Sequence, residues 1–202
     1  RSKRKFIKRL ISALTIIGIR IIFVIVSLAV FARWISKYSF DTLMDYLYDP
    51  YAPPSPEHPL GTTQNGRDIL GRCIWGARTS LTIALPALLL SVFAGLILGT
   101  IAGYSGGWIN SVIMRVMDIL LAFPGLVLVL VFISIWGRDV RYFMLAYGVL
   151  GIAGYARLIR GSVIQAKELD YVKAAQVSGA SKLRIMFKHI LPNTIQPIII
   201  AF

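Results

Sequence analysis

Charged residues and cysteine are scarce in this sequence, and each shortage argues against a class of protein. Charged residues make up 15% of the chain, against roughly 25% in soluble domains, so a soluble globular protein is disfavoured. The single cysteine, Cys73, excludes an internal disulfide. Acidic residues number 9 against 22 lysines and arginines, which gives a net charge of +13.

This basic excess does not indicate a nucleic-acid-binding protein. The lysines and arginines gather at the ends of apolar segments, where the positive-inside rule places them in membrane proteins. We therefore attribute the charge to membrane topology and to attraction for anionic lipid headgroups, and we expect no nucleic-acid partner.

Catalytic patterns are missing as well. The sequence has no G-x-x-x-x-G-K-[ST] phosphate-binding loop, so the chain is not expected to hydrolyse ATP by itself. It has no Ser/His/Asp arrangement, zinc-ligand spacing or pair of catalytic carboxylates. His58 and His189 are better explained as structural residues than as metal ligands. We expect no catalytic, cofactor-binding or metal-binding residues, and a membrane enzyme remains an alternative hypothesis.

Long uncharged runs are the main positive signal. Residues 79–114 and 119–137 contain no charged side chain. A helix needs about 20 apolar residues to cross a bilayer, so the sequence predicts an all-α, polytopic membrane helical bundle. The expected membrane-spanning helices cover residues 10–32, 79–102, 112–136 and 142–159.

The first expected span follows a tail, residues 1–9, with six basic residues and no acid. This bias places the N-terminus in the cytosol. The span resembles the apolar part of a secretory signal, but its length and the lack of a clear cleavage site favour a retained anchor helix. Arg20 lies within it. A mid-membrane arginine either lines a substrate path or, as we prefer, faces a partner subunit or snorkels.

Residues 33–78, between the first two spans, are rich in proline and are expected to form an external loop. In the second span, Gly95 and Gly99 form a small-xxx-small pattern that permits close helix approach. The glycine-rich stretch Gly103–Asn110 then predicts a tight cytosolic turn.

The third span carries two local predictions. Pro124 and Gly125 predict a kink. Arg115 and Asp118 are three residues apart, a spacing at which helical side chains can pair. We prefer this pairing to the alternative, in which Asp118 contacts a substrate.

The basic segment after the fourth span, residues 157–193, lies in the cytosol by the count of crossings and by its charge. A hairpin of two short helices is expected over residues 168–193. The first helix covers about Asp170–Ser178 and ends at Gly179, which suits a C′ position with positive φ. Ser181 is the expected N-cap of the second helix.

In that second helix Leu183, Met186, Phe187 and Ile190 form one apolar stripe at helical spacing, and Pro192 ends the pattern. An amphipathic hairpin of this kind either lies on the lipid surface or docks onto a cytosolic partner. The residues alone leave both possibilities open.

The stretch 171–193 resembles the EAA motif of ABC importer permeases, which has the form E-A-A-x-x-x-G followed at fixed spacing by I-x-L-P. The matching residues are Ala174, Ala175, Gly179, Leu191 and Pro192. Lys173 replaces the glutamate of the motif, and His189 stands at the isoleucine position. In the family this loop forms the coupling helix, which sits in a groove of the ATPase subunit.

A second stretch, residues 58–70, reads HPLGTTQNGRDIL and resembles the HPLGTDxxGRD signature of the peptide/nickel branch. The matching residues are Pro59, Gly61, Thr62, Gly66, Arg67 and Asp68. Thr63 replaces the usual aspartate. The resemblance covers nearly the whole chain from residue 10, and it is to the C-type permease subunit of the oligopeptide/dipeptide/nickel branch.

This resemblance implies a bundle of the ABC importer type with six membrane helices. The chain then holds four complete spans and the start of a fifth at residues 194–202. The resemblance also implies that the hairpin couples the permease to an ATPase. The implied coupling residues are Tyr171, Val172, Lys173, Ala174, Ala175, Ser178, Gly179 and Ala180.

The partners implied by the resemblance are a second, homologous permease subunit in a heterodimer, two ATPase subunits that bind ATP and Mg²⁺, and an external substrate-binding protein. The implied location is the inner or plasma membrane. Peptide is the expected substrate, and nickel or an oligosaccharide are alternatives for the same type of transporter. A membrane scaffold without transport activity is the alternative of another class.

Overall fold

The structure is a computed structural model that describes residues 2–38, 40, 49–137 and 139–194, with side chains from residue 14 onward. Within these ranges every regular element is a helix, and strand-like pairing is limited to an isolated bridge between Thr62 and Asp68. The predicted all-α class is confirmed. The predicted start of a fifth span lies, from residue 195, outside the described residues.

The chain divides into two compact units, residues 1–82 and 83–202. The first unit holds helix α1 (Ser2–Val30), the short helix α2 (Ala32–Ile35) and the beginning of α4 (Ile69–Ser105). Both long helices extend beyond the membrane spans predicted for them. The helix α1 already includes most of the predicted tail, and α4 begins within the stretch predicted as an external loop.

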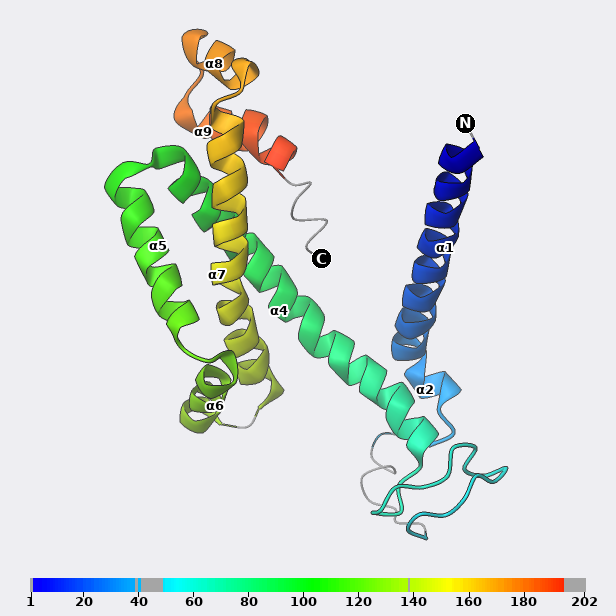
Figure 1. Ribbon diagram of the computed structural model, residues 1–202. Coiled ribbons are helices and arrows are strands. Elements are labelled where there is room, and N and C mark those ends of the chain that lie inside the picture. The colour runs from blue at the N-terminus through cyan, green and yellow to red at the C-terminus, as the bar shows by residue number, and fades with distance from the viewer. Residues whose placement is uncertain (1, 39, 41–48, 138, 195–202) are drawn as a thin grey trace. The chain divides into compact units, whose positions relative to one another are not determined.

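The second unit contains the rest of α4 and the helices α5 (Gly107–Ala122), α6 (Gly125–Trp136) and α7 (Val140–Lys167), with α5 and α6 packed beside α7 (Figure 1). The predicted turn over Gly103–Asn110 shrinks to a single residue, because α4 and α5 together occupy the rest. Gly106 makes the break with a φ of 65°, a backbone conformation that favours glycine.

The kink predicted at Pro124 and Gly125 is confirmed, and α5 and α6 meet at an angle of 88°. Phe123 has extended backbone, with φ −89° and ψ 137°. This is expected for a residue before proline, because the proline ring disfavours helical backbone at the preceding position. The third predicted span, residues 112–136, is therefore made of two helices that meet at a sharp angle, and not of one continuous helix.

Glycines bring α4 and α7 into close contact. A Cβ atom at Gly95 would lie 2.6 Å from a side-chain atom of α7, and one at Gly99 would lie 2.5 Å from the carbonyl oxygen of Ala156. Gly103 continues the row, since its Cβ would lie 2.8 Å from the Cβ of Val163. The predicted small-residue contact is observed, and it extends one turn further than the pattern indicated.

Among the described residues, α4 and α7 are long and apolar enough to cross a bilayer. The bent pair α5–α6 is a third candidate if it counts as one span. The apolar stretch Leu14–Val30 of α1 is shorter than these, so the span over residues 10–32 stays a prediction. Helix α7 continues past residue 159, where the fourth span was predicted to end, and reaches Lys167.

Candidate functional site

Three short helical elements, arranged as two arms, follow α7 in the segment that resembles the EAA motif. Helix α8 covers Asp170–Val177, and the second arm contains α9 (Lys182–Arg184) and a π-helix, η1 (Ile185–Ile190). Asp170 lies in the first turn of α8. A carboxylate there offsets the partial positive charge of the helix N-terminus. We call residues 168–193 the hairpin.

Helix α8 ends in a Schellman motif at Gly179. The Gly179 N–H donates to the Gln176 carbonyl (3.0 Å), and the Ala180 N–H donates to the Ala175 carbonyl (3.1 Å). Gly179 has a φ of +77°, as expected from its place after the helix. Ala175 and Ala180 both pack against the same buried cluster, so the turn is held by backbone hydrogen bonds and by apolar contact.

Ser181 caps the second arm, as predicted. Its Oγ accepts a hydrogen bond from the Arg184 N–H (3.4 Å). Beyond α9 the helix widens into η1, where the Leu191 N–H donates to the Met186 carbonyl five residues earlier. Helical geometry continues past Pro192, which therefore does not end the helix as predicted.

The apolar stripe predicted for the second arm is wrong for half of its members. Met186 and Ile190 are buried, but Leu183 is 67% exposed and Phe187 is 47% exposed. The π-helix is the cause, because it hydrogen-bonds residues five positions apart and places Ile185 on the same side as Ile190. Ile185 fills the buried position, and Leu183 and Phe187 are left as exposed apolar side chains.

A buried cluster joins both arms of the hairpin to α4 and α7. It contains Tyr104 of α4, Ile159, Val163 and Ala166 of α7, Val172 of α8, and Ile185, Met186 and Ile190 of η1. Lys167 adds a polar link, since its Nζ donates to the Tyr104 carbonyl (2.9 Å) and lies 5.3 Å from the centre of the Tyr104 ring. We call these buried residues the root cluster, and the part of the hairpin that they hold the root. The root is therefore attached to the ends of both long helices.

The eight residues that the resemblance implies for coupling do not share one environment. Val172 is fully buried in the root cluster, and Ala175 and Ala180 are half-buried beside it. The exposed members are Tyr171, Lys173, Ala174, Ser178 and Gly179. Small residues among them leave the backbone at the end of α8 open to close approach. Val172 holds the hairpin in place and does not form part of this exposed side.

Sequence reasoning missed Val177, which is 90% exposed at the end of α8. Val172 and Val177 are five positions apart, which corresponds to about 140° around an α-helix. Two valines this far apart around the helix cannot both face the same neighbour, so their spacing in the sequence indicated a second apolar side on α8. Together with Leu183 and Phe187, Val177 gives the hairpin an exposed apolar surface in addition to its buried root.

Lys173 stands where the motif has a glutamate, and it pairs with an acid outside the motif. Its Nζ lies 3.5 Å from Glu168 Oε2, and both side chains are more than half exposed. An exposed pair of this kind contributes little to stability. The lysine is nevertheless balanced locally by the acid in the turn before α8.

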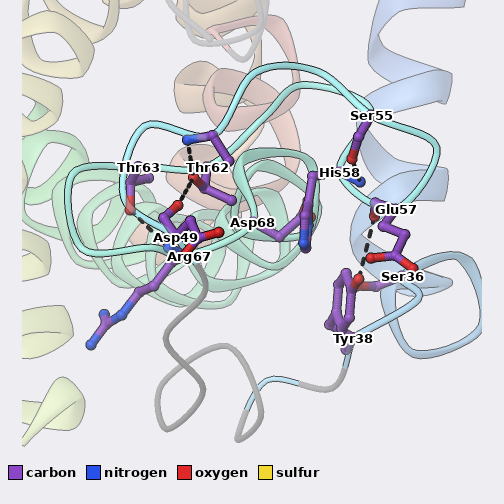
Figure 2. Close-up of polar contacts among 12 residues, drawn as sticks. Ser36, Tyr38, Asp49, Ser55, Glu57, His58, Thr62, Thr63, Arg67 and Asp68 are labelled. Carbon is purple, nitrogen blue, oxygen red and sulfur yellow. Dashed lines mark hydrogen bonds and ion pairs between the residues drawn. The ribbon is translucent and has the colours of Figure 1, made fainter.

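The second signature forms a hydrogen-bonded loop that caps α4 (Figure 2). Asp68 is buried and accepts a hydrogen bond from the Gly71 N–H (2.6 Å) through Oδ2, while its Oδ1 lies 3.0 Å from His58 Nδ1. A capping carboxylate satisfies an N–H group at the start of a helix. The hydropathy predicted that this helix begins at Thr79. The cap explains why α4 already begins at Ile69.

Gly61 and Thr62 shape the same loop. Gly61 has a φ of +74°, and a Cβ there would lie 2.5 Å from the Ala52 carbonyl oxygen, so a larger residue does not fit. Thr62 Oγ1 donates to the Asp49 carbonyl (2.6 Å) and accepts from the Ala52 N–H (2.8 Å). These signature residues build the loop. In the part of the chain that the structure describes, no group of three or more His, Cys, Asp or Glu residues is placed to hold a metal ion.

Asp118 pairs with another helix and not along its own. Its Oδ1 lies 2.6 Å from Arg157 Nη2 of α7. Arg115, the predicted partner, takes part in none of the ion pairs found among the described residues. Asp118 thus pairs across the contact between α5 and α7 and not with its i,i+3 neighbour on α5. The predicted partner of Asp118 is corrected from Arg115 to Arg157.

Three curated relatives are similar over most of this chain. The oligopeptide transport system permease protein OppC of Bacillus subtilis is 37% identical over 93% of the chain. The glutathione transport system permease protein GsiD of Pectobacterium atrosepticum is 34% identical over 90%. The di/tripeptide transport system permease protein DppC of Pseudomonas aeruginosa is 37% identical over 91%. The chain spans 61%, 60% and 62% of the lengths of these three relatives.

A family model described as the binding-protein-dependent transport system inner membrane component matches residues 95–202. The matched region is more than half of the chain and includes α5, α6, α7 and the hairpin. The chain therefore belongs to the family of binding-protein-dependent transport system inner membrane components.

Proposed function

We propose that this chain is a permease subunit of an ATP-driven peptide importer, and that the hairpin couples it to ATPase subunits in the cytosol. One observation carries the proposal: the small exposed residues Ala174, Ser178 and Gly179 lie on a hairpin whose root packs against α4 and α7. A partner seated on the exposed side would move both helices through the root. The names of the relatives, which concern oligopeptides, di- and tripeptides and glutathione, support a peptide substrate.

The proposed assembly contains a second homologous permease subunit, two ATPase subunits that bind ATP and Mg²⁺, and an external substrate-binding protein. Large apolar side chains are exposed along α6, among them Leu126, Leu130 and Ile135. A surface of this kind needs lipid or another apolar protein surface as its neighbour. ATP would drive transport by binding more tightly to one of the two access states of the pathway and shifting the equilibrium towards it.

The proposed orientation has the N-terminus and the hairpin in the cytosol and the start of α4 outside. Cys73 is exposed near the start of α4 and is the single cysteine of this sequence. In intact cells a membrane-impermeant maleimide is expected to label Cys73 in the full-length protein. An Ala174→Cys variant that also carries Cys73→Ser is expected to react only after permeabilisation. Labelling of Ala174→Cys in intact cells would contradict the orientation.

Contact with the ATPase is tested by two neighbouring positions of α8. Ala174 is exposed, whereas Val172 is 0% exposed and serves as the matched control. In the assembled transporter, with Cys73→Ser as background, Ala174→Cys is expected to cross-link to a cysteine series on the ATPase subunit, and Val172→Cys is expected to give no product. Non-reducing gels measure the yield. Equal yields from both positions would count against the proposed docking side.

A further inference from the structure

A polar pocket of about 460 Å³ lies between α5 and α7. Its polar lining consists of Asn110, Ser111, Arg115 and Asp118 of α5 and Arg157 and Arg160 of α7. Ser111, Arg115 and Asp118 follow one another at spacings of four and three positions and so share one face of α5. A different face carries the exposed apolar residues Val112, Val116 and Ile119. Ionisable side chains in membrane helices face protein or a water-filled path and avoid lipid.

The pocket carries excess positive charge. Asp118 is paired with Arg157 at 2.6 Å, and Arg160 Nε donates to Asn110 Oδ1 (2.5 Å). None of the ion pairs of the described residues uses Arg115. Three arginines thus surround one carboxylate that is already paired, and Arg115 is the arginine best placed to accept an additional anionic partner.

The position of the pocket across the membrane follows from where its arginines lie along α7. Arg157 and Arg160 lie about 25–30 Å along the helix from its start at Val140. This distance is close to the thickness of the hydrocarbon core, which is about 30 Å. With the orientation proposed above, the pocket lies at the cytosolic end of the membrane-spanning part of α7.

We propose that this pocket binds the free carboxylate of a peptide near the inner end of the pathway, with Arg115 as its main ligand. The inference rests on the proposed function. A guanidinium group binds a carboxylate through two parallel charge-assisted hydrogen bonds. The Ser111 hydroxyl and the second carboxylate oxygen of Asp118, whose Oδ1 is paired with Arg157, supply acceptors for the amide and ammonium groups of a zwitterionic peptide. A lipid phosphate shares this anion chemistry. The peptide is favoured because the proposed function brings peptides along these helices, and the lipid is one outcome of the test.

The test compares a tripeptide with the same tripeptide amidated at its C-terminus. The complete transporter with its binding protein is reconstituted in vesicles, and uptake is measured below saturation. Arg115→Gln is expected to lower uptake of the free-carboxylate peptide about tenfold and uptake of the amide less than about twofold. Arg115→Lys is expected to fall between, because an ammonium lacks the guanidinium fork. Arg141→Gln removes an exposed arginine at the other end of α7 and should change neither uptake.

The outcomes distinguish failure of the proposed function from failure of the carboxylate site. If the wild-type transporter takes up no peptide with ATP, the proposed function fails and this inference fails with it. If wild-type uptake is normal and Arg115→Gln affects both peptides equally or neither, only the carboxylate site is wrong. A defect that appears for both peptides, and only in vesicles containing phosphatidylglycerol, would assign the pocket to a lipid phosphate and overturn the proposal. Basal ATP hydrolysis of each variant checks that the complex assembles.

Discussion

Replacement of Gly179 with valine is expected to lower ATP-driven peptide uptake at least tenfold while leaving membrane insertion and ATP hydrolysis in place. Gly179 has a φ of +77°, and a Cβ added there meets no other atom within 4 Å. The effect of valine therefore comes from backbone strain of about 1–3 kcal/mol, not from a steric clash. Since about 1.4 kcal/mol corresponds to a factor of ten, this strain is sufficient to displace the turn.

The amount of peptide transported per ATP hydrolysed is the quantity to measure. A displaced turn breaks the hydrogen bonds from Gly179 and Ala180 back to α8, so the ATPase would bind a hairpin that no longer transmits its movement. Gly179→Asn is the matched control, because asparagine tolerates the left-handed conformation better than other non-glycine residues. It is expected to keep most of the coupling. Normal uptake by the valine variant would refute this role of the turn.

Gly99→Leu is expected to prevent stable folding of the second unit. A Cβ at this position would lie 2.5 Å from the Ala156 carbonyl oxygen and 2.9 Å from the Ile159 Cβ. Backbone atoms cannot move aside as a flexible side chain does, so α4 and α7 must separate. Overpacking of a well-packed contact costs about 1–3 kcal/mol, and the separated helices also lose the buried cluster at the hairpin root. We expect a lower yield of monodisperse protein in detergent and a lower Tm.

Gly76→Leu is the control for this prediction, because Gly76 lies on the same helix and has no atom within 4 Å of an added Cβ. It introduces the same side chain without the close contact, so its Tm should stay near that of the wild type. Equal Tm values for the two leucine variants would mean that close approach at Gly99 does not hold α4 and α7 together.

Local rules predicted the turn of the hairpin and the break between α5 and α6 well. Gly179 and Ser181 were identified from residue type and position alone, and the structure places a left-handed turn and a side-chain cap there. The kink at Pro124 was predicted for the same reason, because proline restricts its neighbour whatever the tertiary context. The start of α4 was predicted too late, since hydropathy does not register a capping carboxylate such as Asp68.

Features that depend on tertiary contact were predicted poorly. The partner of Asp118 is Arg157, 39 positions away in the sequence, and no helical spacing rule connects them. The buried side of the second arm was misplaced because the sequence pattern assumes 3.6 residues per turn, whereas η1 bonds residues five apart. The sequence also did not show which of the implied coupling residues are buried and which are exposed, because that depends on the root cluster formed with α4 and α7.

The wide turn in η1 also gives the second arm room to lose a residue. Each hydrogen bond of a π-helix encloses one residue more than the corresponding bond of an α-helix. Deleting one residue between Ile185 and Ile190 would therefore restore α-helical bonding with little rotation of the residues that follow. The helical stretch at residues 191–194 would then keep nearly the same direction. A one-residue deletion is thus better tolerated within η1 than in the regular α-helices beside it, where it would rotate the following residues by about 100°.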